Sequence, residues 1–180
     1  LLRRSTVLGD SIAASIFQWS STDGGHNAFL NSFPSSYIPP VSDSSWLPTP
    51  SPMTPTFNYK PALQPYWGNN RPFISENLSA ALTLLPPPKF DTISSSEFYK
   101  AAKEIYDSSL VLTDEQKAIA IFWRDESGSY SPPGHSIAIT NIILRQTNAS
   151  LEKAAFTYAE IGVAVADAFI NCFKKKYIFN

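Results

Sequence analysis

The chain has 180 residues, 43% hydrophobic and 13% aromatic, which is enough to bury a sizeable core as one domain over residues 1–180. Its 14 basic and 15 acidic residues give a formal net charge of -1, so no electrostatic feature points to nucleic acid or to an anionic membrane surface. A single cysteine, Cys172, excludes an internal disulfide.

The first predicted element is an amphipathic helix over residues 5–20. Leu8, Ile12, Ile16 and Trp19 recur in it at three- and four-residue steps, which places them on one face. The turn sequence Asp-Gly-Gly that follows would end the helix. We expect it to pack against the rest of the domain by its apolar face.

A proline-rich stretch comes next, because thirteen of the fifteen prolines fall between Pro34 and Pro88. Regular helix is excluded over most of this interval. Aromatic side chains are interleaved with the prolines, and water disfavours their exposure. The segment 34–90 is therefore predicted to form a long ordered wrap that covers the helices. Its aromatic residues include Tyr37, Trp46, Phe57, Tyr59, Tyr66, Trp67 and Phe73.

Three helices with recognisable start signals follow the wrap. Ser94 with Glu97, and Thr113 with Gln116, match the pattern in which a hydroxyl and a carboxylate or amide three residues later cap a helix N-terminus. Ser131 followed by two prolines predicts the third start, since proline fits the first helical turn. No segment alternates like a strand, so the predicted fold class is all-α.

The last thirty residues, 151–180, predict a helix with apolar residues nearly all round. Such a helix has little solvent-facing surface, so we expect a helical bundle built around a buried C-terminal core helix. Its length would suit a bilayer, but Glu160 and Asp167 would be costly there, and no transmembrane span is predicted. One narrow polar stripe runs along it, made of Glu160, Asp167, Asn171 and Lys174.

Lys176 differs from the other lysines at the end of this helix. Helical steps back from it reach Phe173, Phe169 and Val165, which places its stem on the apolar side, where a buried positive charge would require an anion. The alternative is that the lysines of the last turn complement the helix dipole and extend their stems outward. The residues alone leave both interpretations open.

A polar loop precedes the helix that begins near residue 132. Arg124, Asp125, Glu126 and His135 lie within a dozen positions, and the helix N-terminus would offer N–H groups to an anion. The alternative is a surface pair of Arg124 with Asp125 or Glu126, with His135 packed in the first helical turn. The sequence Pro-Pro-Gly-His-Ser has proline where an oxyanion loop would need a serine, which argues against direct chemistry by His135.

Several segments together resemble a known family. The sequences SIAASIFQWSSTDGG, PYWGNNRPF, FWRDESGSYSPPGHSIAI and AVADAFINCFKKKYIFN occur in this order. They resemble the N-terminal half of bacterial members of the vanadium-dependent haloperoxidase and type 2 phosphatidic acid phosphatase (PAP2) superfamily. In that family the first anion-binding motif is a lysine, six residues and Arg-Pro, and Lys176 to Asn180 supply the lysine and four of the six spacers.

The resemblance implies roles for three residues. Lys176 would contact an equatorial oxygen of vanadate or phosphate. Asp125 would be the carboxylate that orients the lysine or an arginine, with Glu126 as an alternative at nearly the same spacing. Phe173 would line the substrate pocket beside the anion. The Pro-Pro-Gly-His-Ser segment precedes the lysine motif, whereas the family's catalytic loop follows it, so no catalytic residue is expected within this chain.

The resemblance also implies a cofactor, partners and a location. Vanadate is expected for a haloperoxidase, and no cofactor for an acid phosphatase. The implied partners are a small oxyanion, a phosphate ester or a halide with peroxide, and the remainder of its own chain, since the 180 residues would be the N-terminal part of a larger enzyme. A homodimer is compatible with the likeness. An extracytoplasmic location, after removal of a signal, is favoured over the cytoplasm.

A hypothesis from another class is a non-catalytic helical module that binds a glycan or peptide through the proline-rich wrap. It predicts Trp46, Tyr66 and Trp67 on one exposed patch, whereas an enzyme would bury most of them as cover over the helices. A membrane-associated lipid phosphatase is disfavoured, because no uncharged span is present.

Overall fold

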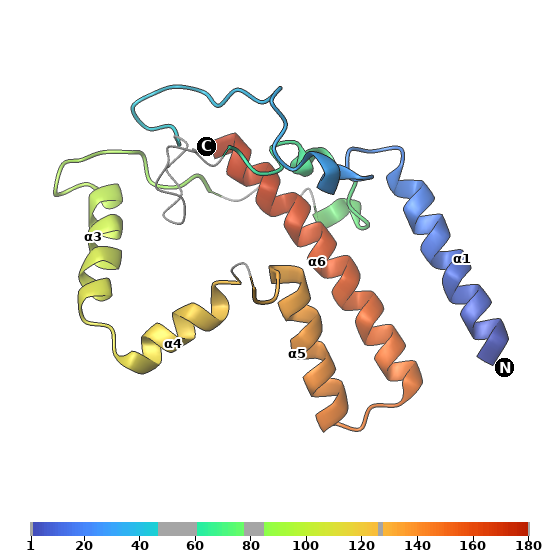
Figure 1. Cartoon of the computed structure of the whole chain (residues 1–180). Coiled ribbons are helices and arrows are strands. Elements are labelled where there is room, and N and C mark those ends of the chain that lie inside the picture. The colour runs from blue at the N-terminus through green and yellow to red at the C-terminus, as the bar shows by residue number, and fades with distance from the viewer. Residues whose placement is uncertain (1, 47–60, 78–84, 126–127, 180) are drawn as a thin grey trace. The chain divides into compact units, whose positions relative to one another are not determined.

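The regular structure of the protein is helical. The computed structural model describes residues 2–46, 61–77, 85–125 and 128–179, and no strand occurs in them (Figure 1). The prediction of an all-α fold is confirmed.

The chain divides into two compact units. Unit 1 combines residues 1–84 with residues 166–180, and unit 2 comprises residues 85–165. Helix α6, Leu151–Phe179, contributes its first half to unit 2 and its end to unit 1. The single domain predicted over residues 1–180 stays a prediction.

Unit 1 begins with helix α1, Leu2–Ser20, close to its predicted bounds. Its C-terminal end is closed by Arg71, whose guanidinium donates to the Trp19 carbonyl at 2.6 Å and lies 4.1 Å above the indole ring. A cation is stabilising at this end of a helix, where carbonyls are left without helical partners. Asp23 accepts from the N–H groups of Gly25 and Arg71, at 2.8 and 3.1 Å, and so connects the end of α1 to the wrap.

The apolar face predicted for α1 is exposed in the structure. Leu8 and Ile12 each keep more than half of their surface accessible. The helix pattern was therefore predicted correctly, whereas the packing expected of that face is not observed.

The wrap follows an irregular path through unit 1 and contains a short 3₁₀ helix at Trp67–Asn69. Another 3₁₀ helix, Ala28–Asn31, precedes it. At Gly68 it contacts the backbone of α6 so closely that an added Cβ would lie 2.4 Å from the Lys174 Cα. Only glycine permits this approach. The part of the wrap at residues 47–60 lies outside the described residues.

Unit 2 contains α3, Glu97–Leu110, and α4, Asp114–Trp123. Both members of the capping box predicted for α4 are present. The cap predicted for α3 is wrong, because the N-cap is Ser96, whose hydroxyl accepts from the Tyr99 N–H at 3.1 Å.

The reason for this shift lies upstream of α3. The Asp91 carboxylate accepts from the Ile93 N–H at 2.8 Å, and the Ser96 N–H donates to the Ile93 carbonyl at 2.9 Å. This turn contains Ser94, so the helix begins later than the capping pattern indicated.

Helix α5, Pro132–Gln146, starts as predicted, with the Ser131 hydroxyl accepting from the Gly134 N–H. A short connection then turns the chain back into α6 (Figure 1). Burial along α6 is concentrated near its C-terminal end, at Asp167 and Ile170. Within the described residues α6 is also a helix long and apolar enough to cross a membrane. Core helices of soluble proteins have the same property, so the prediction of no transmembrane span stays a prediction.

Candidate functional site

Lys176 lies in the last turn of α6, where the helix dipole favours a cation. Its ammonium is 5.6 Å from the centre of the Phe173 ring, so the structure brings these two predicted site residues together in unit 1. The side chain is exposed, and it forms no ion pair with a described residue. Its charge is therefore available to an anion from outside.

A pocket of about 290 Å³ lies beside Lys176 within unit 1. Its lining joins the wrap to the end of α6 and consists of Trp46, Pro61, Ala62, Leu63, Lys176 and Tyr177. The Tyr177 hydroxyl donates to the Leu63 carbonyl at 2.5 Å, which fixes one wall to another. Burial, and to a smaller extent the neighbouring Tyr37, raises the pKa of Tyr177 above its ordinary value of 10.0.

An aromatic cluster contacts the pocket wall at Tyr177. The Tyr37 ring meets Tyr177 and Tyr66 edge to face, with centroids 5.3 and 6.1 Å apart. The binding-module hypothesis predicted that Trp46, Tyr66 and Trp67 would be exposed, and the enzyme hypothesis predicted that most of them would be buried. Trp46 and Tyr66 are 39% and 45% exposed, and Trp67 is half-buried. They form neither the fully exposed patch of a binding module nor a buried cover.

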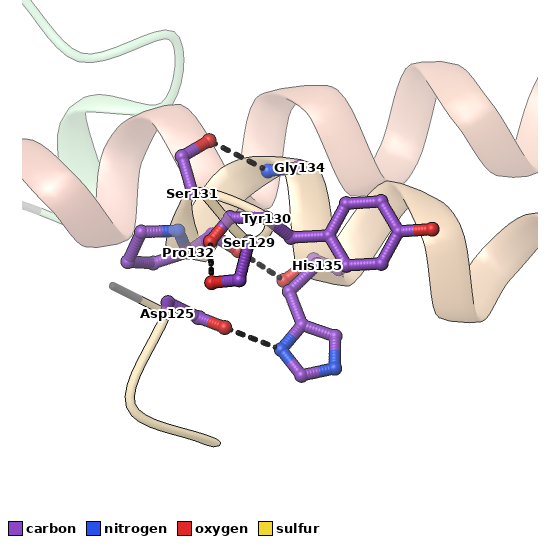
Figure 2. A network of polar contacts seen from close by, with 8 residues as sticks. Asp125, Ser129, Tyr130, Ser131, Pro132, Gly134 and His135 are labelled. Atoms are coloured by element: carbon purple, nitrogen blue, oxygen red, sulfur yellow. Dashed lines mark hydrogen bonds and ion pairs between the residues drawn. The ribbon is translucent and has the colours of Figure 1, made fainter. Parts of the chain in front are cut away.

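A second polar group lies in unit 2. The His135 Nδ1 and the Asp125 carboxylate are 2.7 Å apart, and the two side chains are only 4% and 10% exposed (Figure 2). Asp125 ends the described loop after α4 with a φ of 48°, a left-handed conformation that aspartate tolerates better than most residues. His135 reaches it from the first turn of α5.

The His135 imidazole is enclosed by aromatic rings. It stacks on Trp123 at 4.6 Å and on Tyr130 at 5.8 Å, and Phe122 meets it edge-on at 4.7 Å. Its Nε2 is buried and has no hydrogen-bond partner in the described structure. The group is therefore a buried hydrogen-bonded pair held within an aromatic box, which we call the His135 box.

The predicted residues thus separate into two places. Lys176 and Phe173 are neighbours in unit 1, whereas Asp125 lies in unit 2 and bonds His135. The orientation of Lys176 by Asp125 stays a prediction, and Glu126 lies outside the described residues. The Asp125 side chain is nearly buried against His135. The pairing of Arg124 with Asp125 or Glu126 stays a prediction.

Sequence reasoning missed the Asp125–His135 pair as a unit. The available signal was the aromatic residues on both sides of the loop, at Phe122, Trp123 and Tyr130, which indicate a buried environment for the histidine that follows them. The described residues contain no cluster of three or more His, Cys, Asp or Glu side chains suited to a metal ion.

Lys176 fits an oxyanion such as vanadate in part. Its cationic donor beside an aromatic ring suits an anion oxygen, and it forms no ion pair with a described carboxylate. An oxyanion needs several donors, and Lys176 supplies one of them.

One comparison with known proteins bears on the fold. No protein-family model matches the chain, and no curated protein matches it. A solved structure similar to it is titled the crystal structure of the first bacterial vanadium-dependent iodoperoxidase, with a TM-score of 0.77, 29% sequence identity and coverage of 98% of this chain. The chain spans 42% of the length of that protein. It therefore has a haloperoxidase-like fold.

Proposed function

We propose that this chain is the N-terminal part of a vanadate-binding enzyme of the haloperoxidase type. The observation that carries the proposal is the likeness to a vanadium-dependent iodoperoxidase over nearly the whole chain. The position of Lys176 supports it, because its ammonium lies at the end of α6, where the resemblance expects an anion ligand, and forms no ion pair with a described residue.

In this proposal Lys176 donates a charge-assisted hydrogen bond to an oxyanion oxygen. Vanadate, when bound, supplies the centre at which peroxide is activated for halide oxidation. The Phe173 ring, whose centre is 5.6 Å from the ammonium, lines the halide side of the site. The nearby Gly68 contact fixes the wrap against α6 and so limits the movement of the helix end that bears the lysine.

The test is vanadate binding and iodide oxidation by the gene product that contains this chain. We expect Lys176→Met to weaken orthovanadate binding about tenfold, measured by equilibrium dialysis, which is the scale of one charge-assisted hydrogen bond at an accessible site. Iodide oxidation with peroxide should fall in parallel. Lys175→Met is the matched control, since its ammonium lies over Phe179 and not over Phe173.

Unchanged vanadate affinity in Lys176→Met would remove this lysine from the site. Absence of vanadate binding in the unmodified gene product would refute the proposal as a whole. Hydrolysis of phosphate esters without peroxidase activity would instead support the acid phosphatase that the same resemblance allows. The extracytoplasmic location and the homodimer remain predictions.

A further inference from the structure

The pocket beside Lys176 has the size of a small-molecule site. Its volume of about 290 Å³ lies at the lower end of the range for ligand pockets, which start at roughly 300 Å³. A single ring with one substituent fits this space, whereas a glycan chain or a peptide does not. The pocket therefore does not suit the glycan or peptide considered for the proline-rich wrap.

The walls of the pocket are held in place without a ligand. Tyr177 is bonded to the Leu63 carbonyl, and the Tyr37 ring supports it edge-on at 5.3 Å. Ala62, which also lines the pocket, is buried at 8% exposure. A preformed wall loses little conformational freedom on binding, which favours affinity for a rigid ligand.

The chemistry of the lining is apolar with one charge. The indole of Trp46 and the side chains of Pro61 and Leu63 offer apolar surface, and Lys176 is the charged member of the six described lining residues. Because Lys176 forms no ion pair with a described carboxylate, a ligand anion would neutralise it without displacing a partner.

We propose that this pocket binds a small aromatic carboxylate. The ring lies against Trp46 and Leu63, and the carboxylate accepts from the Lys176 ammonium. A bare halide would leave the apolar walls in contact with water, and a neutral ring would form no ion pair with the Lys176 ammonium. The carboxylate uses the same ammonium that the proposed function assigns to vanadate, so the two anions would compete for Lys176. The inference adds an aromatic ligand class and is tested without vanadate.

The experiment compares benzoate with its neutral analogue benzamide in vanadate-free buffer, using calorimetry on the gene product that contains this chain. We expect benzoate to bind about fivefold more tightly, the range of an ion pair at an exposed lysine. Lys176→Met should abolish the difference, and Lys175→Met should preserve it. Trp46→Leu should weaken both ligands by about threefold to tenfold through loss of ring contact.

Equal affinity for benzoate and benzamide in the unmodified protein would overturn the proposal. So would a preference for benzoate that persists in Lys176→Met, because the charge would then come from elsewhere. Circular dichroism of each variant confirms that the helices are retained. Because vanadate is absent, a failure here leaves the proposed oxyanion site untouched, and failure of vanadate binding leaves this pocket untouched.

Discussion

The backbone N–H of Phe73 donates a 2.7 Å hydrogen bond to the carboxylate of Asp167, which lies 94 residues further along the chain. Ile74 and the side-chain amide of Asn77 donate to the other carboxylate oxygen at 3.0 and 2.9 Å. Asp167 is 1% exposed. A buried carboxylate that accepts three hydrogen bonds is satisfied without a cation, and it fastens the wrap to the end of α6.

We expect Asp167→Asn to destabilise the protein by about 2–3 kcal/mol. The amide has one acceptor oxygen in place of two, and its NH₂ group would face donors that then lose their partner. The free energy of unfolding in urea measures the effect. Glu160→Gln is the control, because it neutralises an exposed carboxylate on the same helix. An equal loss in both variants would show that charge, and not the hydrogen bonds to the wrap, is responsible.

Gly68→Ala is expected to cost about 1–3 kcal/mol, as overpacking does in a tight contact. The new methyl would meet the Lys174 Cα at 2.4 Å and its N at 2.5 Å, and backbone atoms cannot give way as the end of a side chain can. Thermal or urea unfolding measures the loss. In the control Gly9→Ala nothing lies within 4 Å of the added methyl, and alanine should raise stability by up to about 1 kcal/mol in α1.

The hydrogen bond in the His135 box predicts that the stability effects of variants at Asp125 and His135 are coupled. Removing either member of the Asp125–His135 pair leaves the other buried without its hydrogen-bond partner, at a cost of about 1–3 kcal/mol. Asp125→Gly and His135→Phe each remove one partner of this hydrogen bond, and glycine adopts the left-handed φ of 48° without strain. We expect the double variant to be less destabilised than the sum of the two, by about 1.5–3 kcal/mol. Strict additivity in urea unfolding would contradict a direct interaction.

The raised pKa of Tyr177 predicts that the protein loses stability at high pH. Its pKa in the folded protein is raised by burial, so the neutral phenol is favoured over the phenolate. The contribution is complete below pH 10.0, the ordinary pKa, and is lost as the pH rises above it toward the folded pKa. Tyr177→Phe should flatten this part of the stability profile and cost about 1 kcal/mol at neutral pH, for the lost hydrogen bond to Leu63.

The control for Tyr177 is Tyr106→Phe, which alters an exposed phenol in α3. Unfolding free energies measured from pH 8 upward, in roughly half-unit steps, would compare the two variants. If Tyr106→Phe flattened the profile as much as Tyr177→Phe, the pH effect would belong to tyrosines in general and not to the pocket.

Local features of the sequence were sufficient for most helix starts. The caps formed by Thr113 with Gln116 and by Ser131 bond groups within four positions of each other. Both partners of each hydrogen bond are therefore visible in the local sequence. Ser94 was predicted wrongly for a reason of the same kind, because the turn at Asp91 competes for the same few residues.

The candidate site was predictable only in part. Lys176 and Phe173 are three residues apart on one helix, so the helical period alone brings them together. Asp125 and His135 were recognised as a cluster, but the sequence did not specify which group the carboxylate would bond. The return of the chain into α5 and the aromatic packing decided this.

The sequence by itself determined that the chain is helical, where several of its helices begin, and that a polar stripe runs along α6. Only the tertiary structure decided that Asp167 in this stripe is buried under residues 73–77, and that Gly68 covers the backbone of Lys174. The physical reason is distance along the chain. Capping groups find partners within one turn, whereas a buried carboxylate is satisfied by donors from a remote segment that only the folded chain brings to it.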